Sequence, residues 1–275
     1  MLAKMLLSRI SRDYSIWQKI GLFRHGDMDR FSYATGIFNG HVERAGLKNK
    51  LEGLAILEAG PGDSISTAIL SRAYGATSTL VDAGRYAVDD VRPYLKLEAF
   101  LRSEGLDVPD ISELNSLDEL LTRCDSKYLV NGLESLKTIP DNSIDFIFSQ
   151  AVLEHVRKSE FIETMRQYAR IIKPKGICSH RVDLRDHLGG GRNNLRFSDA
   201  LWESNFFVNS GFYTNRIQFK LMLEMFEQAG FEVEVTKVNR AAALPIKRNQ
   251  LARDFSDTSD SDLLITVFDV LLRVR

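Results

Sequence analysis

The sequence predicts an α/β fold built on a mainly parallel sheet. From residue 54 onward, short apolar segments alternate with segments of helical periodicity, which is the pattern of β-α-β units. One apolar segment, residues 54–59, runs directly into a glycine turn, and another, residues 144–148, is apolar on both faces as central parallel strands are. The 275 residues, 44% hydrophobic and 27% charged, suit one folded domain with additions.

Residues 1–50 are predicted to form a helical extension in front of a main domain at residues 51–275. In residues 1–23, Lys and Arg interrupt the apolar side chains, which argues against a membrane span or a signal peptide. We expect an amphipathic helix here that caps the domain or joins the subunits of a homodimer. The alternative is peripheral contact of this helix with an anionic membrane surface.

The further elements are predicted from apolar periodicity and turn residues. The first unit has a strand ending at residue 59, a helix over SISTAILSRAYG and a second strand at residues 79–82 that ends on an acid. Residues 85–126 are predicted to be helical. The remaining predicted strands lie at residues 127–130, 144–148, 176–183, 231–238 and 263–274, and the remaining helices at residues 157–172 and 216–230.

Residues 188–216, after the fifth predicted strand, form a segment rich in Gly, Asn and aromatic residues that is longer than an ordinary connection. Its three adjacent glycines suit a hinge, and its aromatic and Arg side chains suit ligand contacts, so we expect an active-site lid. The alternative is a capping subdomain in which the aromatic residues form the core and the arginines face solvent.

The strongest local motif is Glu58 followed by a Gly60-x-Gly62 turn at the end of a predicted strand. Glycines there allow close approach of a ligand to the backbone. Asp82 ends the next predicted strand, at the interval where a carboxylate can accept both ribose hydroxyls of a nucleoside. This spacing also fits NAD(P) enzymes, but Ile65 replaces the third glycine of their motif and Glu58 would repel a pyrophosphate. The site is therefore predicted to bind a cationic nucleoside without phosphates.

EAGPGDS resembles motif I of class I S-adenosylmethionine (SAM)-dependent methyltransferases, residues 80–82 resemble their ribose-binding acid, and PDNSIDFIFSQAVLEHV resembles their fourth-strand motif. The resemblance covers residues 50–240. It implies a Rossmann-like, seven-stranded sheet with helices on both faces, and SAM as the cofactor. The family often has Asp in the loop before strand four, where this chain has residues 131–134, so the adenine contact stays open. The cofactor-binding residues that the resemblance implies are Glu58, Gly60, Pro61, Gly62, Asp63, Asp82, Ala83, Leu133, Glu134, Ser149, Gln150 and Leu153.

Four ionisable residues are candidates for the catalytic step: His155, after strand four, and His180, Asp183 and His187, at the end of strand five. A histidine can act as a general base near neutral pH. The alternatives are a hydrogen-bonded structural role for His155 and a salt-bridge network for the others. Glu154 and His155 with His180 or His187 could also bind a divalent metal, as a similar pair does in small-RNA 2′-O-methyltransferases. No tight ligand spacing supports this here, so no metal is predicted.

The predicted function is transfer of a methyl group from SAM to a small-molecule or glycan acceptor, with a hydroxyl as the expected target. The segments RVDLRDHLGGGRNNLRFS and SGFYTNR resemble methyltransferase-domain proteins of bacterial surface-polysaccharide synthesis. The alternatives are an NAD(P)-dependent oxidoreductase and a non-catalytic SAM-binding scaffold. A net charge of −1 predicts no nucleic-acid partner, and only two cysteines suit a cytoplasmic protein.

Overall fold

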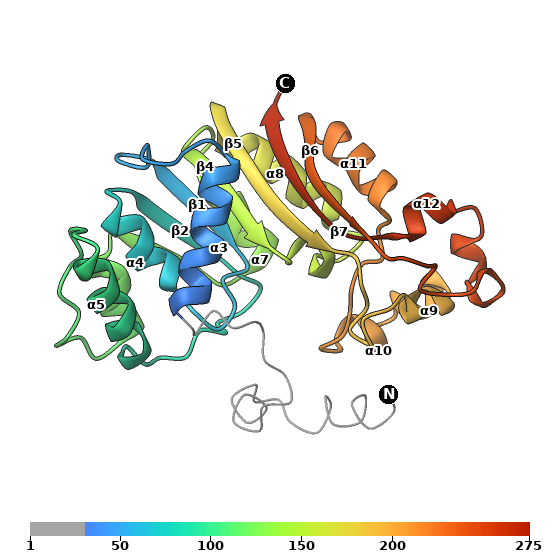
Figure 1. Ribbon diagram of the computed structural model, residues 1–275, viewed down its shortest axis with the longest axis horizontal. Helices are drawn as coiled ribbons and strands as arrows, with labels where there is room; N and C mark the ends of the chain where they lie inside the picture. Colours follow the sequence, from blue (N-terminus) through green and yellow to red (C-terminus); the bar gives the residue numbers. More distant parts are fainter. Residues whose placement is uncertain (1–30) are drawn as a thin grey trace.

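The computed structural model describes residues 31–275, which form a seven-stranded sheet in the order β3-β2-β1-β4-β5-β7-β6 (Figure 1). The strand β7 runs antiparallel to both of its neighbours, and the other pairs are parallel. The predicted Rossmann-like sheet of seven strands is confirmed. The strands are β1 (Ala55–Ala59), β2 (Thr77–Val81), β3 (Ser126–Leu129), β4 (Ile144–Gln150), β5 (Ile172–Asp183), β6 (Phe231–Arg240) and β7 (Ile265–Val274).

Helices cover both faces of the sheet, as predicted. On one face lie α3 (Phe31–Arg44), α4 (Ser66–Ala73), α5 (Leu95–Ser103) and α6 (Leu117–Arg123), and on the other lie α7 (Gly132–Lys137), α8 (Phe161–Ile171) and α11 (Phe219–Gln228). Because side chains of a strand alternate between faces, β4 contributes Phe146 and Phe148 to the first core and Ile147 to the second.

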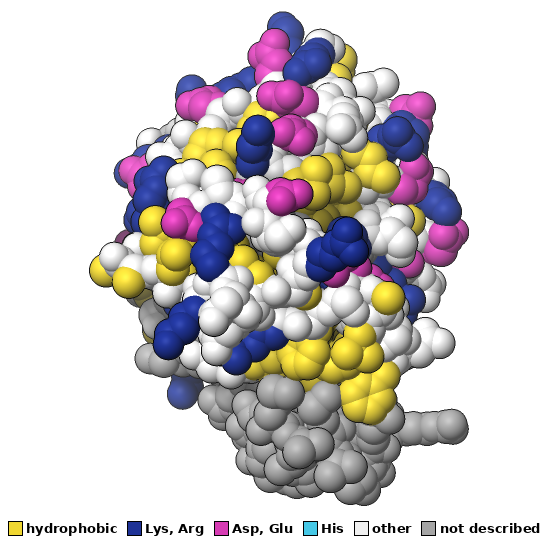
Figure 2. Space-filling model, turned by 90° about the vertical axis from the view of Figure 1, so that its right-hand side faces the viewer, with side chains coloured by type: hydrophobic (Ala, Val, Ile, Leu, Met, Phe, Trp, Pro, Cys, Tyr) yellow, Lys and Arg dark blue, Asp and Glu magenta, His cyan; other side chains and the backbone are white. Residues whose placement is uncertain are grey.

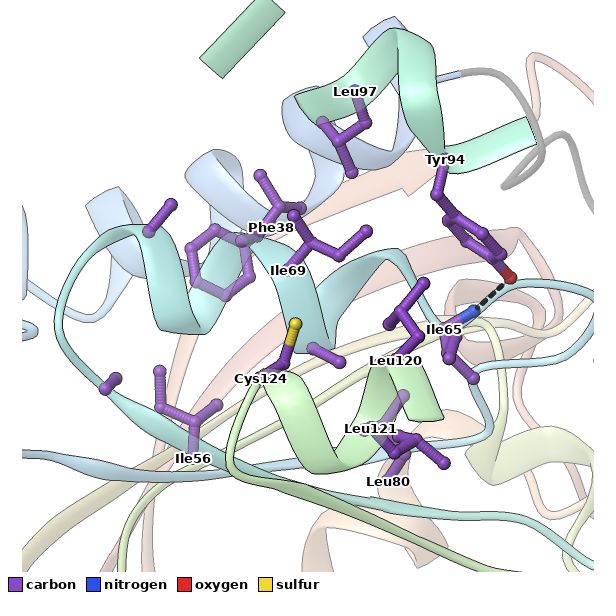
Figure 3. Packing of buried hydrophobic residues seen from close by; sticks show 14 of the residues in the cluster. Phe38, Ile56, Ile65, Ile69, Leu80, Tyr94, Leu97, Leu120, Leu121 and Cys124 are labelled. Carbon is purple, nitrogen blue, oxygen red and sulfur yellow. Dashed lines mark hydrogen bonds between the residues drawn. The ribbon is translucent and has the colours of Figure 1, made fainter. Parts of the chain in front are cut away.

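The helices α3, α4 and α5 pack side by side on the first face (Figure 3). Ile65, the residue in place of a third glycine, is fully buried in this core. The hydroxyl of Tyr94, in the short helix η1 (Arg92–Tyr94), accepts a hydrogen bond of 3.0 Å from the Ile65 backbone N–H, as Figure 3 shows. The start of α4 is thereby anchored to the connection between β2 and β3.

The strand β5 begins four residues earlier than predicted. Ile144 pairs with Ile172 and Phe146 with Ile177, so residues 173–176 bulge out of the ladder. Pro174 lies in this bulge, where its missing N–H removes no ladder bond. The predicted helix over residues 157–172 is shorter in the structure, because α8 begins at Phe161 and ends at Ile171.

Residues 188–216 and 241–264 fold together into what we name the capping subdomain, at the right of Figure 1. It contains η3 (Asn193–Arg196), α9 (Asp199–Trp202), α10 (Asn205–Val208), η4 (Arg248–Gln250), η5 (Arg253–Phe255) and α12 (Asp260–Leu263). Trp202, Phe207, Phe212 and Tyr213 form an aromatic cluster within it. The aromatic side chains are thus a core, which was the alternative stated for the predicted lid.

The arginines of this subdomain do not all face solvent, and that part of the alternative is wrong. Arg192 and Arg216 are buried, at 2% and 4% exposed. The Arg216 guanidinium lies 5.0 Å from the ring centroids of both Trp202 and Phe255 and pairs with Asp199 at 2.6 Å. On the outer surface of this end of the molecule, acidic, basic and apolar side chains are interspersed (Figure 2).

The predicted amphipathic helix at residues 1–23 lies outside the described residues. The described part of the predicted extension is α3, whose Phe38 and Val42 belong to the core of the first face. Within residues 31–275, no helix is both long and apolar enough to cross a membrane.

Candidate methyl-donor site

The glycine turn after β1 has the backbone conformation that its residues permit. Gly60 and Gly62 have φ angles of +69° and +65°, a region that side chains other than glycine rarely adopt. A Cβ added to Gly60 would lie 2.5 Å from the Val152 side chain, which follows β4. The turn and the segment after β4 therefore approach each other so closely that only glycine fits at position 60.

Asp82 joins the ends of β1 and β2. Its Oδ2 accepts a hydrogen bond from the Gly62 N–H at 3.0 Å, and its Oδ1 accepts one from the Ala83 N–H at 2.7 Å. Burial raises the pKa of the Asp82 carboxyl to about 6, although both backbone bonds oppose the rise. The structure brings together the predicted glycine turn and the predicted ribose acid.

Glu58 is buried at the end of β1, at 2% exposed. Its Oε2 has no hydrogen-bond partner among residues 31–275. Burial raises the pKa of this carboxyl to about 8, and the Asp82 charge adds to the rise. A buried carboxyl with an unsatisfied oxygen fits a cationic group such as the ammonium of SAM, because an ion pair there would favour the charged form. The residues present fit the predicted cofactor.

The remaining predicted contacts near β1 and β2 differ in exposure. Pro61 is buried, Asp63 is half-buried and Ala83 is exposed. The Gly132 N–H donates to the Asp82 carbonyl at 2.8 Å, which brings the start of α7 beside Asp82. In the first turn of this helix Leu133 is half-buried and packs against the second core, whereas Glu134 is exposed and pairs with Lys137 at 2.6 Å.

At the end of β4, Ser149 and Leu153 are fully buried and Gln150 is half-buried. Ser149 lies on the face of α8, whereas Gln150 lies on the face of α3. Between them and Leu153 the chain turns at Ala151, whose φ is +54°. Of these three predicted contacts, Gln150 is the one with exposed surface in the described chain.

His155 and His187 form an exposed pair of stacked rings, with centroids 5.0 Å apart and Nε2 atoms 3.2 Å apart. The His155 Nδ1 lies 2.9 Å from the Tyr213 carbonyl, which can only accept, so Nδ1 donates. In the neutral ring Nε2 then carries no proton and accepts from His187. Backbone contact with the capping subdomain thus orients His155 as a proton acceptor.

His180 and Asp183 are placed differently. His180 is 0% exposed, stacks on Tyr168 and lies 2.7 Å from Ser149 through Nδ1, and burial lowers its pKa to about 3. A ring without exposed surface does not reach an acceptor, so we withdraw His180 from the catalytic candidates. Asp183 forms a two-pronged ion pair with Arg185, the nearer contact at 2.6 Å, which agrees with the salt-bridge alternative.

The metal alternative required Glu154 and His155 with His180 or His187. Glu154 is 2% exposed and its Oε1 accepts from the Asp183 N–H, so it faces the interior. Across the described part of the chain, no group of three or more His, Cys, Asp or Glu side chains could hold a metal ion.

One buried polar cluster was not predicted. It joins His41 and Arg44 of α3 to Gln150, Ser179 and Asp269 on the sheet. Nothing in the sequence near His41 marks it, because its partners Gln150 and Ser179 are 109 and 138 residues away. The pattern of β4 and β5 could have indicated only that residues 150 and 179 share a face.

A family model described as "Methyltransferase domain" matches residues 33–236. No curated protein matches the chain in sequence.

Among solved structures, an S-adenosylmethionine dependent methyltransferase from Mesorhizobium loti is 16% identical, with 86% of this chain and 99% of that chain covered and a TM-score of 0.45. Phosphoethanolamine N-methyltransferase 2 from Haemonchus contortus is 14% identical, with 86% and 51% covered and a TM-score of 0.47. The arsenic(III) S-adenosylmethionine methyltransferase from Chlamydomonas reinhardtii is 13% identical, with 82% and 64% covered and a TM-score of 0.47. Since the family match spans more than half of its residues, this chain belongs to the methyltransferase domain family.

Proposed function

We propose that the protein transfers a methyl group from SAM to a hydroxyl of a small molecule or glycan. The observation that supports this most directly is the joining of the glycine turn to Asp82 through the Gly62 N–H, with buried Glu58 beside them. Asp82 is assigned to the ribose hydroxyls and Glu58 to the ammonium group. We also assign to the cofactor Gly60, Pro61, Gly62, Asp63, Ala83, Leu133, Glu134 and Gln150. Ser149 and Leu153 have no exposed surface, so we assign them to the layer beneath the cofactor rather than to contact with it.

When bound, the cofactor supplies a methyl group already activated on a sulfonium. The chain has then to position the acceptor, exclude water and remove one proton from the acceptor hydroxyl. We assign proton removal to Nε2 of His155, since the Tyr213 carbonyl holds the other ring nitrogen as a donor. His187 donates to the same atom in the unliganded protein, so the acceptor hydroxyl has to displace it before His155 Nε2 takes the proton.

The acceptor class is the least constrained part of the proposal. The sequence resemblance to proteins of surface-polysaccharide synthesis supports a glycan, and the placement of His155 beside the capping subdomain supports an acceptor that this subdomain selects. The family match supports methyl transfer in general. We propose a sugar hydroxyl as the first acceptor to test.

Isothermal titration with S-adenosylhomocysteine (SAH), NAD⁺ and NADP⁺ tests the cofactor. We expect one SAH to bind per chain and neither dinucleotide to bind, because the fully buried Ile65 replaces the third glycine of the dinucleotide-binding motif. Binding of NAD⁺ or NADP⁺ without SAH would replace the proposal by the oxidoreductase alternative. Transfer of label from methyl-labelled SAM to cell-envelope extracts then tests the reaction, since a scaffold binds SAH yet labels nothing.

A further inference from the structure

The helix α3 holds a histidine against β4 and β5. His41 is 1% exposed, with Nδ1 2.9 Å from the Ser179 hydroxyl and Nε2 3.1 Å from Gln150 Oε1. Gln150 and Ser179 face α3 because side chains alternate along each strand. One residue of the helix therefore contacts both strands, and it contacts β4 at the last residue of that strand.

The contacts of Arg44 determine where the His41 ring has its proton. Arg44 Nη1 lies 3.1 Å from His41 Nδ1, and a guanidinium can only donate, so Nδ1 accepts. Burial, with Arg44 adding to it, lowers the pKa of His41 to about 3, so the ring is neutral near pH 7. Its single proton is then on Nε2, which donates to Gln150 Oε1.

Arg44 is itself fixed by Asp269 of β7, 2% exposed, which accepts from Arg44 Nη2 at 3.1 Å. A chain of directed contacts thus runs from Asp269 through Arg44 and His41 to Gln150. Arg44 Nη1 also donates to the Ser179 hydroxyl at 3.1 Å, and this hydroxyl can donate in turn to His41 Nδ1 at 2.9 Å, so both contacts of Nδ1 leave it an acceptor. The direction of the hydrogen bond at Gln150 follows from the directions of these hydrogen bonds.

The proton on His41 Nε2 fixes the orientation of the Gln150 amide. An amide can exchange its oxygen and nitrogen by a half-turn unless a neighbour distinguishes them. The Nε2–H of His41 distinguishes them, because it requires an acceptor and so holds Oε1 toward α3. The NH₂ group of the half-buried Gln150 is then left to donate to another partner. Gln150 is the last residue of β4, and the carboxyl ends of parallel strands are where α/β sheets bind their ligands.

We propose that His41 is a positioning residue that turns Gln150 so that the amide NH₂ donates to the bound cofactor. This inference rests on the proposed function. It gives α3, in the segment predicted as an N-terminal extension, a part in cofactor binding without direct contact. Gln150 makes the contact, and His41 acts through it.

A double-mutant cycle on SAH affinity tests the inference. We expect His41→Leu to raise the Kd for SAH about tenfold, which corresponds to about 1.4 kcal/mol, because one oriented hydrogen bond contributes up to about 1.5 kcal/mol. His41→Gln should stay within about threefold of wild type, because its amide can also donate to Gln150. In a Gln150→Ala background, His41→Leu should change the Kd less than about twofold.

Equal increases in Kd for His41→Leu in both backgrounds would show a structural role only and overturn the inference, as would an unchanged Kd in the wild-type background. If the wild-type protein binds no SAH at all, the proposed function itself fails. These two failures are therefore distinguishable in the same set of titrations.

Nitrogen NMR of the wild-type protein labelled at histidine gives a measurement that does not depend on folding of the leucine variant. Near pH 7 we expect His41 to be neutral, with the proton on Nε2 and none on Nδ1, and His41→Gln assigns its signals. A proton on Nδ1 would require Nε2 to accept from Gln150, and that result would overturn the proposed orientation.

Discussion

The carboxylate of Asp82 accepts a hydrogen bond of 3.0 Å from the backbone N–H of Gly62, and this bond joins the turn after β1 to the end of β2. Its second oxygen accepts from the Ala83 N–H at 2.7 Å. Asp82 therefore stabilises the glycine turn without any ligand. Substitution at this position should change both the shape of the turn and the affinity for a nucleoside.

Asp82→Ala is expected to weaken SAH binding about 100-fold, because hydrogen bonds to a charged acceptor contribute about 1.5–3 kcal/mol. Isothermal titration measures the effect. The matched control is Asp118→Ala, which removes an exposed carboxylate paired with Arg85 and should leave the affinity unchanged. Wild-type affinity in Asp82→Ala would contradict the assignment of this residue to the ribose.

The affinity for SAH should also depend on pH through Asp82. Burial raises its pKa to about 6, and hydrogen bonds from ribose hydroxyls favour the charged form. Glu58, whose pKa is raised to about 8, must also lose its proton to pair with the ammonium group, so the affinity should already fall below about pH 8. Protonation of Asp82 should steepen this fall below about pH 6, by up to about tenfold per pH unit. We expect Asp82→Asn to bind weakly and to lose the added fall below about pH 6. An equal added fall in Asp82→Asn would assign this part of the pH dependence to another group.

Glu58→Gln should raise the stability of the unliganded protein at pH 8 while weakening its binding of SAH. The pKa of Glu58 is raised to about 8 in the folded protein, above its value in the unfolded chain, so the folded state holds the proton more tightly. The stability that this proton supplies is complete below about pH 4 and is lost as pH rises toward 8. Urea unfolding without ligand at pH 8 should therefore show Glu58→Gln to be more stable than wild type, by on the order of 2–4 kcal/mol.

The same variant should bind SAH weakly, because an amide does not pair with an ammonium group. Glu154, whose pKa burial also raises to about 8, contributes its own pH dependence equally to both proteins and so cancels in the comparison. Glu58→Gln that is no more stable than wild type at pH 8, or that binds SAH equally well, would contradict the role given to Glu58.

The parts of the fold that the sequence predicts are those with local signals. The strand that contains Glu58, the glycine turn after it and the place of Asp82 after the next strand were predicted correctly, because apolar runs, glycines and an acid follow one another between residues 54 and 82. The start of β5 was missed because Pro174 suggests a break, and only pairing with Ile144 shows that the strand resumes across the bulge. Strand pairing is a tertiary property that residues 172–176 do not encode alone.

The residues of the candidate site also divide into those with a local sequence signal and those whose place depends on contacts between distant elements. His180 was a plausible catalytic residue by its place at a strand end, but the alternation of β5 turns it to the face of α8, where Tyr168 covers it. His41 had no local signal, because its role depends on contacts with two distant strands. Local motifs therefore predicted the residues near the backbone turn better than those that depend on side-chain contacts across elements.

His155→Ala is expected to lower the rate of methyl transfer about 100- to 10,000-fold with little change in SAH affinity, because general-base catalysis contributes on that scale and the ring is assigned to the acceptor. Turnover of labelled SAM on cell-envelope extracts, with SAH titration beside it, makes the measurement. His187→Ala should lower the rate less, since it removes only the partner of His155 Nε2. Unchanged rates in both variants would leave positioning as the only catalytic contribution of this pair.

Arg216→Lys tests whether the capping subdomain depends on its buried guanidinium. Arg216 donates to the carbonyls of Asn194 and Phe197, pairs with Asp199 and lies between two aromatic rings, and its side chain is 0% exposed. A lysine cannot make these planar contacts together, so we expect a loss of about 3 kcal/mol in urea unfolding. Arg196→Lys is the matched control, because Arg196 is exposed and should change stability by less than about 0.5 kcal/mol.

The effect should extend to catalysis, because Asn215, next to Arg216, donates from its side chain to the carbonyls of Leu153 and Val156 and from its backbone to that of Glu154. These bonds fix the segment that contains His155. Arg216→Lys should therefore lower turnover more than it raises the Kd for SAH, since the glycine turn and Asp82 lie at other strand ends. Equal stability of the two lysine variants, or a loss of SAH affinity as large as the loss of turnover, would show that the subdomain does not act through His155.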